Sequence, residues 1–127
     1  MKNSYAPGKH LLLDLYQASN LSDETVIEDA LVSAAEACGA KVLQKRLHSF
    51  GENQGITGML LLAESHISIH TWPESGFAAI DIFMCGSCNP DLAIVPIKQH
   101  LRPKTIEVRE FERGMSLDKA TSQNKSI

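Results

Sequence analysis

The sequence predicts an α+β fold, a two-layer sandwich in which a mainly antiparallel sheet carries two helices on one face. The first observation is size, because 127 residues with 43% hydrophobic content suit one compact domain with a modest core. The second is the order of the expected elements, which runs strand, helix, several strands, helix, strand. The third is that no internal repeat or linker divides the chain. Residues 1–127 are therefore expected to form a single domain.

Two segments have the pattern of helices. In the first, Ser22 fits the N-cap, apolar residues recur at spacings of three and four, and the pattern ends near Cys38. In the second, Asn89 and Pro90 open a helix that reaches about His100. The first helix presents one apolar face, which is expected to pack against the core.

Six segments have the composition of strands, with β-branched, aromatic and leucine residues bounded by turn residues. A polar loop bounded by glycines, Gly51–Gly55, separates the second strand from the third. The polar, aperiodic tail from about residue 115 is expected to be disordered. The expected strands are His10–Tyr16, Lys41–Phe50, Met59–Ala63, Ile67–Trp72, Phe77–Met84 and Thr105–Phe111.

The sheet face opposite the helices would leave apolar side chains exposed unless a second copy of the chain buried them, which favours a homodimer. A chain of this size also has little room for a deep cleft, so a catalytic site is expected at a subunit interface. We expect apolar strand residues to meet the partner, namely Leu12, Leu60, Leu62, Ile80 and Ile82.

Charge and cysteine content narrow the function. The net charge of -3, with no basic tract, argues against binding to nucleic acid. Polar residues interrupt the apolar run in residues 1–17, so we expect neither a signal peptide nor a membrane span. Three cysteines, Cys38, Cys85 and Cys88, are too few and odd in number for a secreted disulfide framework. A cytoplasmic protein with free thiols is expected.

Residues 64–74, ESHISIHTWPE, concentrate a serine, two histidines and two acids in one short segment. His66-x-x-x-His70 and Cys85-x-x-Cys88 have spacings found in zinc sites. Residues four apart on a strand lie about 13 Å apart, too far for one ion, so no metal is expected. Cys85-x-x-Cys88 also fits a redox dithiol before a helix, but that reading leaves residues 64–74 unexplained. A redox or noncatalytic domain is the alternative of a different class.

A third possibility is chemistry on the backbone itself. The G-x-S-x-G motif of serine hydrolases is absent from the sequence. Ser65 can instead attack the carbonyl of Glu64 and turn a strained peptide bond into an ester. Removal of the serine α-proton then breaks the chain and leaves a dehydroalanine, which hydrolyses to a pyruvoyl group. This reaction needs a base, a hydroxyl donor and strain.

Several separated motifs carry a resemblance to a known family. They are GKHLLLDLY at residues 8–16, GITG at 55–58, ESHISIHTWPE at 64–74 and DIFMCG at 81–86. Over about residues 7–114 the chain resembles the short prokaryotic S-adenosylmethionine decarboxylases, which are pyruvoyl-dependent and made as proenzymes. The resemblance implies autocatalytic serinolysis between Glu64 and Ser65, giving a β chain of residues 1–64 and an α chain of residues 65–127.

The resemblance also implies roles for single residues. Ser65 is the pyruvoyl precursor that forms a Schiff base with the substrate, and His70 is the processing base. Cys85 returns a proton to the substrate carbon, a role that suits a thiol with an ordinary pKa of about 8.5. Thr57 stands where the family often has serine, a hydroxyl that assists processing. Cys88 lies outside the family's catalytic pattern.

Substrate binding is implied for two further residues. Glu74 resembles the acid that binds the ribose hydroxyls, and Phe50 resembles the aromatic residue on which adenine stacks. The family decarboxylates S-adenosylmethionine to the aminopropyl donor for spermidine synthesis, without metal or pyridoxal phosphate, in homodimers with sites at the interface. An acid can also hold a guanidinium or ammonium group, so a pyruvoyl-dependent arginine or ornithine decarboxylase is the alternative. Which subunit supplies each residue is left open by the sequence.

Overall fold

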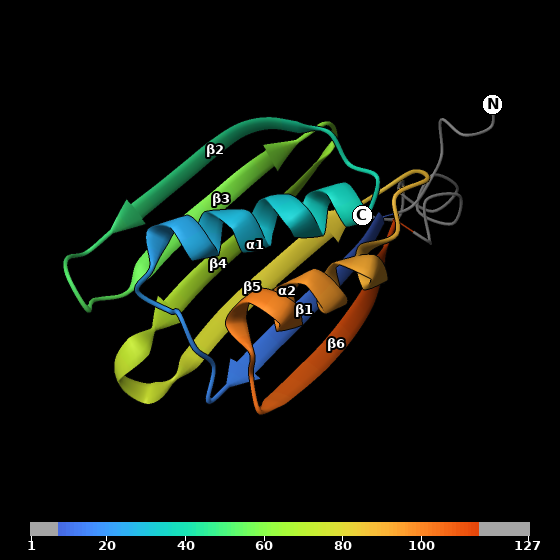
Figure 1. The fold of residues 1–127 in the computed structure, drawn as a ribbon. Helices are drawn as coiled ribbons and strands as arrows, with labels where there is room; N and C mark the ends of the chain where they lie inside the picture. The colour runs from blue at the N-terminus through green and yellow to red at the C-terminus, as the bar shows by residue number, and fades with distance from the viewer. Residues whose placement is uncertain (1–7, 115–127) are drawn as a thin grey trace, which may run out of the picture.

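The computed structural model describes residues 8–114, which form one six-stranded antiparallel sheet with two helices on one face. This arrangement confirms the predicted two-layer α+β sandwich. The two helices pack side by side across the sheet (Figure 1). The elements are β1 (Gly8–Tyr16), α1 (Glu24–Ala37), β2 (Val42–Ser49), β3 (Ile56–Leu62), β4 (Ser65–Trp72), the 3-10 turn η2 (Pro73–Ser75), β5 (Phe77–Met84), the 3-10 turn η3 (Pro90–Ala93), α2 (Ile94–Leu101) and β6 (Thr105–Arg113).

The strand order places the chemically rich segment near the middle of the sheet. The order is β2-β3-β4-β5-β1-β6, and every neighbouring pair is antiparallel. The chain therefore runs as a meander from β2 to β5, while β1 inserts between β5 and β6. As a result β4, which carries the predicted site residues, has a hydrogen-bonded neighbour on each side.

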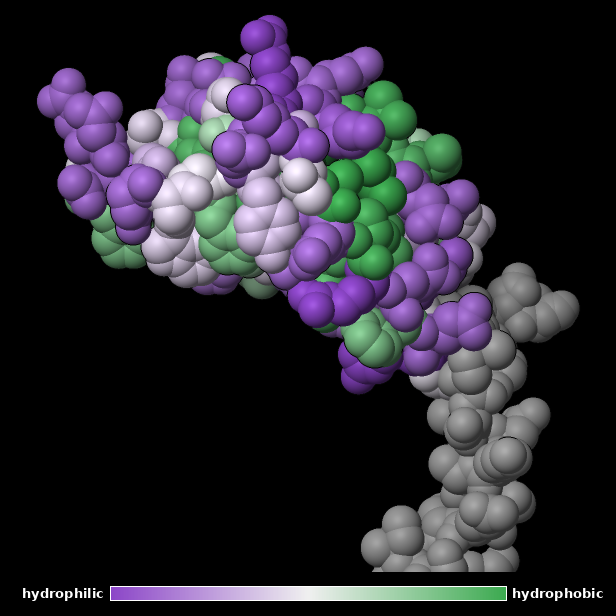
Figure 2. Space-filling view, turned by 90° about the horizontal axis from the view of Figure 1, so that it is seen from below, coloured by the Kyte–Doolittle hydropathy of each residue, from purple (hydrophilic) through white to green (hydrophobic). Residues whose placement is uncertain are grey.

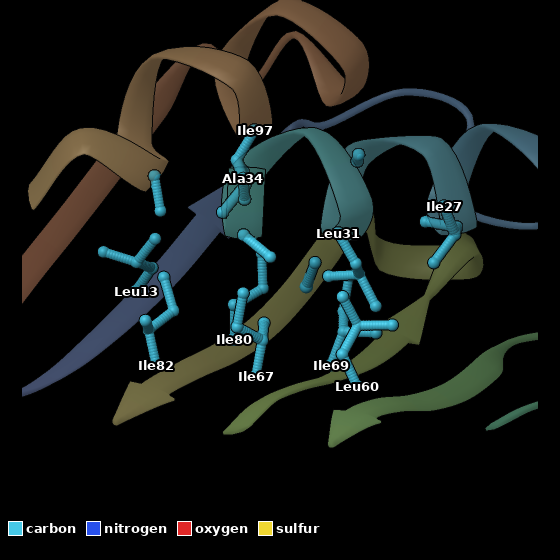
Figure 3. Close-up of a cluster of buried hydrophobic side chains, with 14 of the residues drawn as sticks. Leu13, Ile27, Leu31, Ala34, Leu60, Ile67, Ile69, Ile80, Ile82 and Ile97 are labelled. Atoms are coloured by element: carbon cyan, nitrogen blue, oxygen red, sulfur yellow. The ribbon is translucent and has the colours of Figure 1, made fainter. Parts of the chain in front are cut away.

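Alternation along the strands builds the core against the helices. In β4 the buried side chains are Ser65, Ile67, Ile69 and Thr71, and the residues between them point to the other face of the sheet. Burial of each leucine or isoleucine contributes roughly 1.5–3 kcal/mol to stability. Figure 3 shows the cluster between helices and sheet, with labels on Leu13, Ile27, Leu31, Ala34, Leu60, Ile67, Ile69, Ile80, Ile82 and Ile97.

The helix starts differ from the prediction by a few residues. Asp23, not Ser22, is the N-cap of α1, and its carboxylate accepts a hydrogen bond of 3.1 Å from the backbone N–H three residues later. Both residue types cap helices, but a carboxylate also interacts with the positive end of the helix dipole. The second predicted helix begins as the turn η3 at Pro90, with Asn89 as N-cap, and becomes α2 only at Ile94. No helix among residues 8–114 is long and apolar enough to cross a membrane.

Two strands begin earlier than predicted, which shortens the turn between them. β3 begins at Ile56, three residues early, and β4 begins at Ser65, two residues early. Only Ala63 and Glu64 remain between the two strands. The bond between Glu64 and Ser65 therefore joins a tight turn to the first residue of a central strand. The predicted tail from about residue 115 lies outside the described residues.

The prediction for the uncovered sheet face was wrong for four of five residues. Leu60, Leu62, Ile80 and Ile82 are at most 3% exposed and belong to the core under the helices. Only Leu12 lies on the opposite face, which we call the open face, since it alternates with buried neighbours in β1. Side chains alternate between the two faces of a strand, and apolar content alone did not reveal which of the two sets faces the helices. Several large side chains are exposed on the open face, namely Tyr16, Met59, Leu61, Trp72 and Phe111.

A separate apolar strip lies on the β6 side of the molecule. Figure 2, seen from below, shows hydrophobic side chains gathered between hydrophilic ones. Edge strand β6 carries Val108, which is 45% exposed, and α2 carries Val95, which is 60% exposed. Val108 is the register partner of buried Leu13 and so points toward the helix layer. These exposed valines are therefore distinct from the open face.

Candidate active site

The predicted catalytic residues separate toward the two ends of β4. Ser65 is the first residue of the strand and His70 the sixth, so an extended chain holds their Cα atoms roughly 16 Å apart. The register with β3 pairs Ser65 with Leu62 and His70 with Thr57. The turn at residues 63–64 reverses the chain without bringing His70 back to Ser65. One copy of the chain therefore holds two separate clusters of candidate site residues.

The first group, which we call the cleavage cluster, consists of Glu64, Ser65 and Cys85. β5 ends at Met84 beside the start of β4, and this carries Cys85 to the turn. The Cys85 thiol donates a hydrogen bond to the carbonyl oxygen of Glu64, with an Sγ to O distance of 3.1 Å. That carbonyl belongs to the bond between Glu64 and Ser65. The donor stabilises negative charge on the oxygen, which makes the carbonyl carbon a better target for a hydroxyl.

Glu64 has a strained backbone conformation. Its φ of +65° lies in the left-handed region, where crowding of Cβ costs a non-glycine residue roughly 1–2 kcal/mol. Ser65, the next residue, is only 9% exposed and is paired with Leu62 of β3. Strain, a hydroxyl group and a polarised carbonyl thus meet at one peptide bond. These are the features that the self-cleavage hypothesis requires at that position.

The second group, which we call the His70 hollow, is a depression of about 310 Å³ at the other end of β4. Thr57 Oγ1 and His70 Nδ1 lie 3.3 Å apart across the pair of strands β3 and β4. Phe50 is 62% exposed, so it is free to stack on a ligand and is not a core residue. Glu74 is exposed on the turn η2. With Trp72, these side chains supply an aromatic, acidic and basic lining.

Buried Thr71 determines which way the His70 hollow faces. Thr71 Oγ1 accepts a 2.8 Å hydrogen bond from the backbone N–H of Ile56 and donates a 2.7 Å bond to the carbonyl of Leu21. With Thr71 fixed in the core, alternation puts His70 and Trp72 on the open face. Their ring centroids lie 6.3 Å apart. The hollow therefore opens on the sheet face that the helices leave uncovered.

The cysteines occupy different environments. Burial, with nearby Cys88 and Asp91, raises the pKa of Cys38 to about 11, so Cys38 is a protonated thiol at neutral pH. Cys85 and Cys88 are half-buried free thiols at the carboxyl end of β5. Of these two, Cys85 belongs to the cleavage cluster, through its contact with the carbonyl oxygen of Glu64. The structure thus places Cys85, and none of the residues of the His70 hollow, beside Ser65.

Local spacing missed one cluster of side chains. His66 lies not with His70 but with His10 and Asp81, and both imidazole Nε2 atoms contact the same carboxylate oxygen at 3.0 and 2.8 Å. The extended conformation that argued against a zinc site built from His66 and His70 is confirmed. The new cluster draws on β1, β4 and β5, so no local motif links its members. Their polar positions within apolar strands were the only sequence signal.

Fold and site together define a class of protein. It is a small α+β sandwich in which a strained turn precedes a serine at one end of a central strand, and an aromatic, acid-lined hollow lies at the other end. A family model described as S-adenosylmethionine decarboxylase matches residues 9–114. The S-adenosylmethionine decarboxylase proenzyme of Methanococcus maripaludis is 45% identical over 111 residues, covering 85% of this chain and 90% of that relative. The proenzyme of the same description from Parasynechococcus marenigrum is 47% identical over 109 residues, 84% of each chain.

A solved structure agrees with the sequence relatives. The crystal structure of the adenosylmethionine decarboxylase from Aquifex aeolicus matches with a TM-score of 0.76 at 35% identity, covering 87% of this chain and 92% of that one. This chain belongs to the S-adenosylmethionine decarboxylase family. The resemblance inferred from the separated motifs is thereby confirmed.

Proposed function

We propose that this chain is the proenzyme of an S-adenosylmethionine decarboxylase that makes a pyruvoyl group from its own Ser65. The observation that carries the proposal is the bond between Glu64 and Ser65, with a φ of +65° on one side and the Cys85 thiol 3.1 Å from its carbonyl oxygen. Membership of a family whose relatives are described as proenzymes supports it. Cleavage would divide the single domain into chains of residues 1–64 and 65–127.

Self-cleavage at this bond can be written with its atoms balanced. Ser65 Oγ attacks the carbonyl carbon of Glu64, the C–N bond breaks, and the hydroxyl proton passes to the nitrogen, which leaves an ester and a free amine. A base then removes the Ser65 α-proton, the Cβ–O bond breaks, and Glu64 departs as a carboxylate. Water replaces the nitrogen of the resulting dehydroalanine and ammonia leaves. In this scheme His70 is the base, and Thr57 fixes its ring through the 3.3 Å contact at Nδ1.

The remaining site residues suit the decarboxylation. When formed, the pyruvoyl ketone supplies the electron sink that loss of carbon dioxide from an α-amino acid requires. Cys85 already lies against the scissile position, so its thiol is placed to hold the proton that returns to the substrate α-carbon. Exposed Phe50 offers its ring face to adenine. The carboxylate of Glu74 can accept hydrogen bonds from both hydroxyls of a ribose.

Two copies of the chain are needed to assemble one site. Ser65 and His70 lie roughly 16 Å apart on a straight strand, and no bend of that strand joins them. A two-fold axis between facing sheets and perpendicular to β4 would lay one β4 antiparallel on the other. The Ser65 end of one copy would then meet the His70 hollow of the other, and the exposed apolar side chains of both open faces would be covered. We therefore propose a homodimer with two shared sites.

Complementation between two inactive variants tests this arrangement. A Ser65→Ala chain lacks the nucleophile and a His70→Ala chain lacks the base, so neither should cleave alone. When the two are produced together in equal amounts, random pairing puts about half of the His70→Ala chains in mixed dimers. Those chains should cleave, because their Ser65 meets the His70 of the other copy. Absence of cleavage, with mixed dimers verified by differently tagged chains, would contradict the shared site.

A matched pair controls for general damage. His100 also carries an imidazole, but it lies in α2, where its Nδ1 contacts the carbonyl oxygen of Pro96, and it belongs to neither cluster. A His100→Ala chain should cleave alone at the normal rate. Co-production of His100→Ala with Ser65→Ala should leave cleavage of the His100→Ala chain unchanged.

Substrate choice is tested by release of carbon dioxide. The purified, cleaved enzyme is supplied separately with S-adenosylmethionine, arginine and ornithine. We expect turnover of S-adenosylmethionine, because Phe50 and Glu74 in the His70 hollow suit a nucleoside. Turnover confined to arginine or ornithine would refute the substrate proposal and leave the pyruvoyl chemistry intact.

The proposal also includes a cytoplasmic location. Cys38, Cys85 and Cys88 are all free thiols, which fits a reducing compartment. The proton donor role of Cys85 requires the reduced form. Fluorescent fusion at the carboxyl terminus, with fractionation of the cells, would test the location.

A further inference from the structure

The cluster of His10, His66 and Asp81 has no role in the proposed reaction. It lies on the open face, where β5 runs between β4 and β1. Phe83 is the register partner of His66 on one side and of His10 on the other, and Asp81 precedes Phe83 by two positions on the same face of β5. The three side chains are between a fifth and a third exposed. They form a half-buried polar group that is open toward the uncovered side of the sheet.

Distances within the cluster fit a metal ion. Asp81 Oδ2 lies 2.8 Å from His10 Nε2 and 3.0 Å from His66 Nε2, and the three donor atoms all lie within 4.8 Å of one another. Two ligands bound to one ion at about 2.0–2.2 Å are separated by about 2.8–3.1 Å when adjacent in octahedral geometry and by about 3.3–3.6 Å in tetrahedral geometry. Small rotations of the side chains would therefore admit an ion between the two imidazoles and the carboxylate.

Neighbouring side chains orient the ligands. The Ser68 hydroxyl donates a hydrogen bond to Asp81 Oδ1, which leaves Oδ2 directed toward the histidines. The Phe83 ring packs beside both imidazoles, with centroid distances of 5.3 Å to His10 and 6.1 Å to His66. Such outer contacts hold metal ligands in place in known sites.

The chemistry of the donors also suits a cation, because imidazole nitrogens and a carboxylate oxygen are ordinary ligands of divalent transition metals. One opposing charge is Arg113, whose Nη1 lies 3.4 Å from His10 Nδ1. Arg109 also lines a hollow beside Asp81, but its guanidinium pairs with Asp14 at 2.8 Å. Arg113 is exposed at the end of β6, so its side chain can swing away when His10 Nδ1 carries the proton.

We propose that His10, His66 and Asp81 form a binding site for a divalent transition metal ion, separate from the decarboxylation chemistry. Two imidazole nitrogens and one carboxylate oxygen select Zn²⁺, Co²⁺ or Ni²⁺ over Mg²⁺ and Ca²⁺, which prefer all-oxygen ligands. Three protein ligands leave further positions for water or for a group of a second copy. In the sequence, spacing paired His66 with His70, and the separation of these two residues along a strand argued against a metal site. The fold instead brings His66 close to His10 and Asp81.

Cobalt titration of the purified full-length protein, without an affinity tag and after chelator treatment, tests the site. Co²⁺ is supplied both to the folded protein and during refolding, so that a closed dimer does not exclude it. We expect one Co²⁺ ion per chain, with d–d absorption bands but no thiolate-to-cobalt charge-transfer band. Zn²⁺ should displace the Co²⁺, and Mg²⁺ at the same concentration should not. Absence of binding, a thiolate band, or displacement by equal Mg²⁺ would overturn the assignment.

Substitutions locate the ion. His10→Asn and Asp81→Asn should each weaken Co²⁺ and Zn²⁺ binding by at least about tenfold, since loss of even an outer-shell partner costs that much. Arg113→Gln should bind at least as tightly as the parent, because it removes the competing donor. Two matched controls, Asp14→Asn and His100→Gln, change residues outside the cluster. The Asp14 carboxylate pairs with Arg109, and the His100 imidazole contacts its own helix. Unchanged affinity in His10→Asn and Asp81→Asn, with circular dichroism that matches the parent, would refute the site.

Discussion

Replacing Glu64 with glycine tests whether backbone strain drives self-cleavage. Glu64 has a φ of +65°, which costs a residue with a Cβ roughly 1–2 kcal/mol and costs glycine almost nothing. The hydrogen bond from Cys85 goes to the backbone carbonyl, so the substitution retains it. If attack by Ser65 releases the strain, Glu64→Gly should slow cleavage by about five- to thirtyfold, because 1.4 kcal/mol of barrier corresponds to about tenfold in rate.

Cleavage can be followed by denaturing gel electrophoresis after a pulse of cell-free synthesis. Glu64→Ala is the matched control, because it removes the carboxylate and keeps the Cβ and the strain. Glu64→Asn is intermediate, since asparagine tolerates the left-handed region better than most residues. The alanine variant should cleave fastest, the asparagine variant more slowly and the glycine variant most slowly. A glycine variant that cleaves as fast as the alanine variant would refute the role of strain.

Three further predictions concern other parts of the site. Cys85→Ala should slow self-cleavage about tenfold, because it removes a hydrogen bond worth about 1–1.5 kcal/mol, and Cys85→Ser should recover most of the rate in the same gel assay. Asp81 has a pKa below 3.8 because its hydrogen bonds outweigh burial, so it stabilises the fold above that pH, and this contribution is lost as pH falls through the lowered pKa. Urea denaturation should therefore show wild type more stable than Asp81→Asn at about pH 6, with the gap closing below about pH 3.8. Phe50→Ala should raise KM for S-adenosylmethionine about tenfold without lowering Tm, because Phe50 is 62% exposed.

Each of these predictions has its own check. A Cys85→Ser chain as slow as Cys85→Ala would argue against hydrogen-bond donation to Glu64. A constant stability gap between wild type and Asp81→Asn across the acid range would contradict the lowered pKa. Leu92→Ala also truncates an exposed apolar residue, outside the His70 hollow, and should change neither KM nor Tm. Equal KM values for Phe50→Ala and Leu92→Ala would remove Phe50 from the substrate site.

The fold class was predictable because hydrophobic alternation and turn residues mark the strands and helices along the chain. The exact helix start was not, because Ser22 and Asp23 are both good caps and only the hydrogen bond to Asp23 distinguishes them. The sequence also did not show which side chains of each strand face the helices. Leu60 and Ile80 face the helices because of register, which depends on pairing between segments and not on the composition of either.

The residues of the candidate site were proposed from the sequence, but their arrangement could not be predicted from it. Motif resemblance selected Ser65, His70 and Cys85, and the structure puts the Cys85 thiol beside the carbonyl of Glu64, at the bond proposed to be cleaved. Sequence order could not show that His70 lies with Thr57 at the far end of β4, since that depends on the two-residue turn and the resulting register. The histidine and aspartate cluster on the open face was invisible for the same reason, because its members are brought together only by the order of the strands.

Intact-mass measurement of the purified protein tests the central claim most directly. We expect two chains that meet between Glu64 and Ser65, the second with a mass lowered by conversion of serine to pyruvoyl and reactive toward a carbonyl reagent. A Ser65→Ala protein should give one chain of full mass. A wild-type protein that remains one unmodified chain under all conditions would contradict self-cleavage at this bond.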